Sequence, residues 1–155
     1  MNFGGLSNTL LKHGINCDFM TNLKLQNKSK VLKSNYSNSL GLTLDAIEIG
    51  LRSVNPVALM KNSVKIEGNN LSIFDYIGKK TKFDIGLFGS IYLVGAGKAT
   101  ASMVDSFISI LNNKKIKDGC ITVPYGIEMK SDICSVTNAA HPIPDSNGVL
   151  GTKKI

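Results

Sequence analysis

The most constraining stretch of this sequence is Ile91–Met103, where a short apolar run leads into a glycine turn, a lysine and a segment with helical spacing. A helix N-terminus presents unpaired backbone N–H groups and a partial positive charge, so it favours an anion. Glycine lets the backbone approach that anion closely, and Lys98 adds a full positive charge in the same place. This order of elements predicts an anion or phosphate site formed by Gly95, Ala96, Gly97 and Lys98.

The rest of the C-terminal half continues the alternation of strand and helix. We expect strands at 91–94, 120–123 and 133–137, a helix at about 98–112, and a last helix that begins near Asp145 or Ser146. Short apolar strands that alternate with helical segments are typical of a parallel sheet in a layered α/β fold. The fold prediction is therefore a Rossmann-like three-layer α/β domain. The last helix reaches Ile155 without a stop signal, so we expect an incomplete domain, cut inside an element.

The N-terminal half carries weaker signals. An amphipathic helix is expected over Thr43–Val54, with Thr43 as its N-cap and Asn55-Pro56 as its end. Its predicted apolar face consists of Leu44, Ile47, Leu51 and Val54. We further expect a short helix at 57–61, a hairpin of 64–66 with 71–73, and mostly connection over 75–90. Residues 1–37 are expected to be a poorly anchored leader before a domain at 38–155.

Composition places the chain among globular proteins. Its 155 residues are 43% hydrophobic and 19% charged, which is enough for one domain with a core. The net charge of +7 comes from lysines scattered along the chain and the single Arg52, and tryptophan is absent. Nucleic-acid sites usually depend on arginine and on basic segments interleaved with aromatics, so we expect no nucleic-acid partner. The apolar runs are too short to cross a bilayer, so no membrane partner is expected either.

Cysteine usage indicates a reducing compartment. Cys17, Cys120 and Cys134 are odd in number and share no CxxC spacing. We therefore expect three reduced thiols in a cytoplasmic protein. Together with His13 they also lack the spacing of a metal site, so no metal ligand is assigned.

The glycine–lysine turn departs from both common phosphate-loop templates. A Walker A loop would need a glycine at Tyr92 and a serine or threonine at Ala99. A dinucleotide fingerprint would need a glycine or alanine at Thr100, and the acid about 20 residues further on, Asp118, is expected in a charged turn. A tight strand–helix turn with an exposed lysine is the structural alternative, although packing alone explains Lys98 poorly.

Two further segments are expected at the same sheet edge. His141 lies between strand and helix in a proline-rich loop that ends at Asp145, and such loops form ligand sites in α/β proteins. His141 can act as an acid or base, or donate to a carboxylate or phosphate. The alternative is structural: His141 satisfies a backbone carbonyl and Asp145 caps a helix. For Tyr125 and Gly126, after the preceding strand, the sequence favours a simple turn.

Three motifs together resemble the N-terminal part of the glycerate 2-kinase family, the type II glycerate kinases whose chains end in a MOFRL domain. They are Val94-Gly95-Ala96-Gly97-Lys98-Ala99, Val123-Pro124-Tyr125-Gly126 and His141-Pro142-Ile143-Pro144-Asp145. The helix that ends in Val54-Asn55-Pro56 also resembles the opening of these proteins, so the resemblance covers roughly residues 38–155.

The resemblance implies phosphoryl transfer from ATP to D-glycerate, usually giving 2-phosphoglycerate, with a divalent cation such as Mg²⁺. It implies two α/β domains with the site between them, so the rest of the first domain and all of the second are expected to be missing here. Lys98 matches an active-site lysine of the family, and His141 and Asp145 match its His-Pro-x-Pro-Asp motif. The general base and the metal ligands are expected outside this chain, and the fragment alone is expected to be inactive.

Two other functions stay open at this point. The first is an NAD(P)-dependent hydroxypyruvate reductase that uses the Gly-x-Gly turn for its nucleotide; Thr100 and the lack of a ribose-binding acid count against it. The second is a non-catalytic module that binds an anion or a partner.

Overall fold

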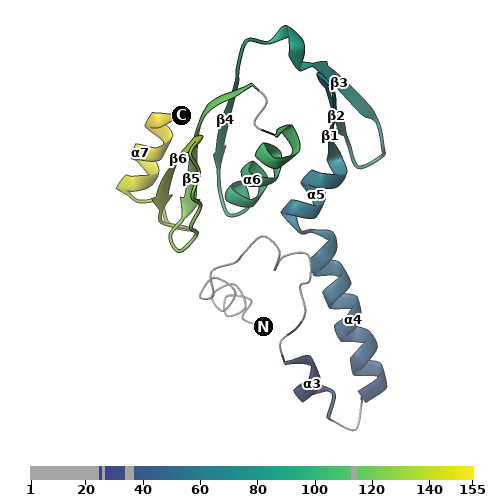
Figure 1. Cartoon of the computed structure of the whole chain (residues 1–155). Helices are drawn as coiled ribbons and strands as arrows, with labels where there is room; N and C mark the ends of the chain where they lie inside the picture. The colour runs from purple at the N-terminus through teal and green to yellow at the C-terminus, as the bar shows by residue number, and fades with distance from the viewer. Residues whose placement is uncertain (1–24, 26, 34–36, 113–114) are drawn as a thin grey trace.

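The computed structural model describes residues 25, 27–33, 37–112 and 115–155. In that part, the strands form two three-stranded sheets, one antiparallel and one parallel. Figure 1 shows the antiparallel sheet at one end and the parallel sheet with its two helices beside it. None of the described helices is long and apolar enough to cross a membrane.

The antiparallel sheet has the order β1 (Val64–Glu67), β2 (Asn70–Phe74) and β3 (Lys80–Asp84). The predicted hairpin is confirmed: β1 pairs with β2 around a turn in which Gly68 has a φ of +60°. The expectation of mostly connection over 75–90 is wrong, because this segment holds β3 and the 3-10 helix η1 (Ile85–Leu87). All five residues of β3 are exposed, so the strand lacks the alternation that a buried face imposes.

The parallel sheet has the order β4 (Ile91–Ala96), β5 (Ile116–Pro124) and β6 (Cys134–Ala139). Helix α6 (Thr100–Leu111) connects β4 to β5, and α7 (Ser146–Lys154) follows β6. The two helices lie on opposite faces of the sheet (Figure 1). The predicted three-layer α/β arrangement with a parallel sheet is therefore confirmed.

Helix α6 joins the cores of the two sheets. One buried cluster is centred on α6 and the parallel sheet and contains Leu93, Ala101, Val104, Ile121, Val123 and Cys134. A second cluster contains Val64, Leu71 and Ile85 from the antiparallel side together with Leu111 at the end of α6. Leu111 has no exposed surface. Burial of these side chains is the main force that holds the helix between the sheets.

The cysteines that the structure describes agree with the expectation of reduced thiols. Cys120 and Cys134 are both buried and free. Burial raises the pKa of the Cys134 thiol, which keeps it protonated and unreactive. Cys17 and His13 lie outside the described residues.

The strands and helices of the parallel unit differ from the expected ranges mainly at their ends. Helix α6 begins at Thr100 and ends at a left-handed Asn112, so Lys98 precedes the helix. Strand β5 begins at Ile116, which places Asp118 inside the strand and not in a charged turn. The expectation for Asp118 was wrong. The first residues of β5 are half-buried or solvent-exposed and lie beside lysines, so their sequence lacks the apolar pattern of a strand.

The N-terminal helices also start differently from the prediction. Helix α4 (Ser37–Ser53) begins six positions before Thr43, so Thr43 is not its N-cap. The Thr43 hydroxyl instead donates to the Ser39 carbonyl one turn back, at 3.0 Å. The short helix is confirmed as α5 (Pro56–Ser63), and the Asn55 side chain caps it by accepting from the N–H groups of Val57 and Ala58.

The apolar face predicted for the helix over Thr43–Val54 is largely exposed. Ile47, Leu51 and Val54 are 46%, 42% and 65% exposed, whereas Glu48 is buried. The Glu48 carboxylate accepts from the Leu25 N–H at 2.7 Å and from Lys28 Nζ at 3.0 Å. Lys28 belongs to α3 (Lys28–Val31), which falls within the segment expected to be a leader, and also pairs with Asp45. Residues 1–24, 26 and 34–36 of that segment lie outside the described residues.

Candidate functional site

The glycine–lysine turn lies at the C-terminal end of β4. Strand β4 extends through Gly95 and Ala96, so the turn itself consists of Gly97, Lys98 and Ala99. Gly97 has a φ of +118°, a conformation that a side chain would strain. Its N–H donates to the Thr122 carbonyl at 3.0 Å, which fixes the turn to β5.

Gly95 is required for a different reason. A Cβ at this position would lie 2.7 Å from Cγ2 of Thr100, in the first turn of α6. Glycine therefore lets the start of α6 pack directly on the end of β4. The two glycines together bring the helix N-terminus close to the strand end.

Lys98 stands immediately before this helix N-terminus. The N-cap residue of α6 is Ala99, which has no side chain to cap the helix, and the first turn holds no acidic residue. Lys98 is exposed, and among the described residues its ammonium forms no hydrogen bond or ion pair. A helix N-terminus without a side-chain cap and an unpaired ammonium have the chemistry of an anion site. The binding roles expected for Gly95, Ala96, Gly97 and Lys98 stay predictions.

The loops after β5 and β6 reach the same edge of the sheet. Because the three strands are parallel and Thr122 pairs with both Ala96 and Thr137, their carboxyl ends lie side by side. Tyr125 and Gly126 follow β5, and residues 140–145 follow β6. Ligands of open α/β sheets bind at this edge.

Two of these loops are joined by a hydrogen bond between side chains. Tyr125 Oη donates to Asp145 Oδ2 at 2.7 Å and accepts from Asn147 Nδ2 at 2.9 Å. The other carboxylate oxygen, Oδ1, accepts from the Gly148 N–H at 2.9 Å and caps α7. The Tyr125 hydroxyl and then the Gly148 N–H lower the pKa of Asp145 below its ordinary value. The same bond to Asp145 raises the pKa of Tyr125.

The sequence anticipated only part of this arrangement. The structural role expected for Asp145 as a helix cap is confirmed, whereas Tyr125 was assigned to a simple turn and Asn147 was not identified. The two bonded side chains are 20 residues apart, and no local motif connects them. The one available signal is that both follow neighbouring parallel strands.

His141 occupies the exposed start of the loop after β6. Its peptide bond to Pro142 is cis. The structural alternative for His141, a bond to a backbone carbonyl, is not present among the described residues, so its imidazole is available to a ligand. Ile143 beside it is 78% exposed. The predicted binding or catalytic roles of His141 and Asp145 stay predictions.

The strand-end loops do not fit a metal site. The described residues contain no group of three or more histidine, cysteine, aspartate or glutamate side chains that could hold a metal ion. Both oxygens of Asp145 already accept hydrogen bonds. The expectation that the Mg²⁺ ligands lie outside this chain stays a prediction.

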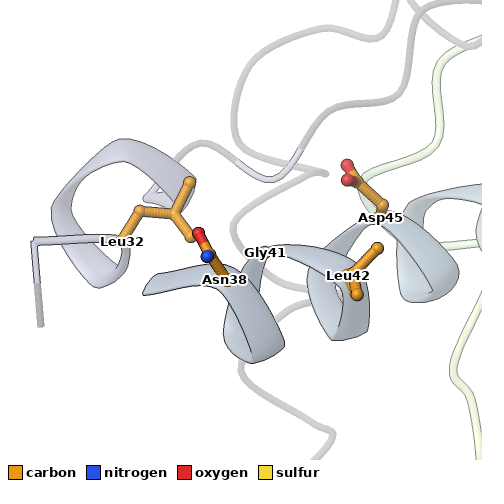
Figure 2. A pocket seen from close by; sticks show the side chains of 5 residues that line it. All are labelled: Leu32, Asn38, Gly41, Leu42 and Asp45. Atoms are coloured by element: carbon orange, nitrogen blue, oxygen red, sulfur yellow. The ribbon is translucent and has the colours of Figure 1, made fainter. Parts of the chain in front are cut away.

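An open pocket lies on the helical side of the molecule. Figure 2 shows its lining side chains, which all come from α4 and the end of α3: Leu32, Asn38, Gly41, Leu42 and Asp45. None of these residues belongs to the strand-end loops. The pocket is thus separate from the candidate anion site.

The fold and the strand-end turn define a Rossmann-like α/β protein with a candidate anion site. Residues 42–155 match the family model described as a domain of unknown function, DUF4147. This match covers more than half of the chain, so the chain belongs to the DUF4147 family.

A sequence match and a structural match from Pyrococcus horikoshii extend the comparison. The chain is 29% identical over 120 residues to a protein named glycerate 2-kinase, a match that covers 73% of this chain and 25% of the relative. It also resembles the crystal structure of the PH0495 protein, with a TM-score of 0.52 and 30% identity over 70% of this chain and 24% of that one. The chain therefore spans about a quarter of the length of the relatives it matches.

Proposed function

We propose that this chain forms part of an ATP-dependent kinase that phosphorylates D-glycerate, giving 2-phosphoglycerate. The observation that carries the proposal is the exposed, unpaired Lys98 beside the uncapped N-terminus of α6. The name of the Pyrococcus horikoshii relative supports it at the level of the family. The activity belongs to the whole protein, of which this chain would supply one side of the site.

In this proposal, Lys98 and the α6 N-terminus bind a phosphate group or the glycerate carboxylate. In the reaction, a glycerate hydroxyl oxygen forms a bond to the γ-phosphorus of ATP, and the bond from that phosphorus to ADP breaks. Phosphoryl transfer depends on positioning and on positive charge more than on covalent catalysis. The Lys98 ammonium would offset the negative charge on the transferred group.

The loop after β6 would complete this side of the site. His141, exposed and without a hydrogen-bond partner in the described structure, would donate to the phosphate or the carboxylate. Asp145 carries a negative charge of its own, so its contribution to anion binding would be indirect. Through its bonds to Tyr125 and Gly148 it would hold the loop that carries His141.

The test is an assay of the longest protein translated from the reading frame that contains this chain. ADP release should require glycerate, and the product should carry phosphate on the 2-hydroxyl by NMR. ATP turnover that is independent of glycerate would contradict the proposal.

The reductase alternative loses support from the position of Asp118. A ribose-binding acid belongs near the C-terminal end of the second strand of a dinucleotide fold, whereas Asp118 is the third residue of the nine-residue β5. NADPH oxidation with hydroxypyruvate would be the result that restores this alternative. A non-catalytic module would instead show protection by phosphate without turnover. The cytoplasmic location stays a prediction that follows from the cysteines.

A further inference from the structure

Strand β4 is an edge of the parallel sheet, and no described strand lies beyond it. The Gly97 N–H points to Thr122 of β5. Because backbone groups alternate along a strand, the amides of Tyr92, Val94 and Ala96 point to the free edge. An unpaired row of this kind is a template for another strand.

The two faces of the sheet are covered by different helices. Ile121 and Val123 of β5 pack with Ala101 and Val104 of α6. Thr122 points to the opposite face, where a Cβ on Gly151 of α7 would lie 3.2 Å from its Cβ. Helix α7 is therefore on the face opposite α6, over β5 and β6 (Figure 1).

The face of β4 on the α7 side is bare and apolar. Val94 pairs with Cys120, and Ala96 pairs with Thr122, so these side chains share the α7 face. Tyr92 and Val94 are 58% and 63% exposed, although Cys120 beside them is buried. The exposed face of β4 continues the side of the sheet that α7 covers on β5 and β6.

The handedness of strand crossovers predicts on which side of the sheet a strand that follows α7 would be added. Crossovers between parallel strands are almost always right-handed. Through α6, on one face, the chain moves from β4 to β5. Helix α7 follows β6 and lies on the opposite face, so a right-handed crossover through it must lead back across the sheet, from β6 toward β4. The first free strand position in that direction is the outer edge of β4.

We propose that the free edge of β4 receives a further parallel strand from polypeptide that follows α7, and that this crossover covers Tyr92 and Val94. The relatives, of which this chain spans about a quarter, have the length to supply such a strand. All strands would stay parallel, but the strand order would extend to both sides of β4, with β5 on one side and the added strand on the other. The turn at Gly97 and Lys98 would lie at the topological switch point, where open α/β sheets form their ligand crevice.

A second copy of the chain is the other conceivable occupant of this edge. The net charge of +7 on each copy opposes self-association. The position of α7 also directs the same polypeptide, and not a separate one, toward β4.

Hydrogen exchange resolved by residue tests the proposal without reference to kinase activity. The comparison is between the 155-residue chain and the longest protein translated from its reading frame. The Tyr92 and Val94 amides should exchange at least about 100-fold more slowly in the longer protein. Leu93, whose amide points to β5, is the matched control and should be protected in both.

Three outcomes would overturn the proposal. One is fast exchange at Tyr92 and Val94 in the longer protein. Another is a reading frame that ends at Ile155, with a monomeric chain whose β4 edge exchanges freely. The third is protection that appears only as the chain dimerises by light scattering, which would assign the edge to a second copy.

A charge substitution gives an independent readout. Val94→Lys should leave the melting temperature of the 155-residue chain unchanged and lower that of the longer protein. Leu87→Lys, at a position that is 82% exposed, is the control and should change neither. An equal effect of Val94→Lys on both proteins would count against a crossover over this face.

Discussion

Tyr125 and Asp145 are joined by a hydrogen bond of 2.7 Å that ties the loop after β5 to the N-terminus of α7. The bond crosses the edge of the sheet on which Lys98 and His141 also lie. The bond therefore connects the end of β5 to the loop of His141, which we propose contacts the substrate.

Removing the Tyr125 hydroxyl should release this connection. In Tyr125→Phe the ring stays but Asp145 Oδ2 loses its donor, so the pKa of Asp145 should rise toward its ordinary value. Carboxyl chemical shifts followed by NMR over acidic pH would measure this change. Tyr76→Phe, at a residue that is 98% exposed, is the control. An unchanged Asp145 titration in Tyr125→Phe would show that the bond does not persist in solution.

The charge of Asp145 should stabilise the fold in a pH-dependent way. Its pKa is lower in the folded protein, so its contribution is present above the unfolded value of about 3.9 and is lost as the pH falls through the folded value. Asp145→Asn keeps an N-cap acceptor for Gly148 but removes the charge. The variant should melt below the wild type at neutral pH, and the gap should close in strong acid. A gap that is the same at every pH would exclude this origin.

Gly151 should be essential to the packing of α7 on β5. An added Cβ would lie 3.2 Å from both Cβ and Cγ2 of Thr122, and closer still to its hydroxyl. Gly151→Ala should therefore lower the free energy of unfolding by ~1–3 kcal/mol in urea titrations. Gly148→Ala, in the same helix, would make only ordinary contacts, the nearest at 3.7 Å, and should be neutral or stabilising. Equal losses in the two variants would refute the close approach.

Lys115 should stabilise the connection between the two sheets through hydrogen bonds. Its ammonium donates to the carbonyls of Ile85, Gly86 and Phe88 at 2.7, 2.9 and 2.8 Å, around η1. Lys115→Met should lower the free energy of unfolding by ~1–3 kcal/mol, because charged donors form the stronger hydrogen bonds. Lys117→Met serves as the control, since Lys117 is exposed and only approaches the Tyr92 ring, at 6.0 Å. Identical stabilities of the two variants would contradict the role.

The parallel unit could be predicted because its signals are local. Apolar runs mark β4, β5 and β6, and Asp145 carries the composition of a helix cap. Strand β3 could not be predicted in the same way. Its sequence Lys80–Asp84 has no apolar alternation, and its structure comes from pairing with β2, a tertiary effect.

The candidate site likewise has features that local sequence signals predict and features that depend on tertiary contacts. That Lys98, Tyr125 and His141 reach one edge follows from parallel strands alone. The Tyr125–Asp145 bond does not, because it depends on the directions of two side chains 20 residues apart. The exposed face of α4 was also beyond prediction, since helical spacing identifies an apolar face but not what covers it.

In the proposed reaction, Lys98 stabilises negative charge during phosphoryl transfer to glycerate. The most direct measurement is kcat/KM for glycerate of Lys98→Ala, in the longest protein translated from this reading frame, with Lys79→Ala as a control in an exposed turn. We predict a loss of about 100-fold to 1,000-fold for Lys98→Ala, the scale of one lost electrostatic contact in a transition state, and no change for the control. A loss of less than about tenfold in a folded Lys98→Ala protein would exclude this role of Lys98.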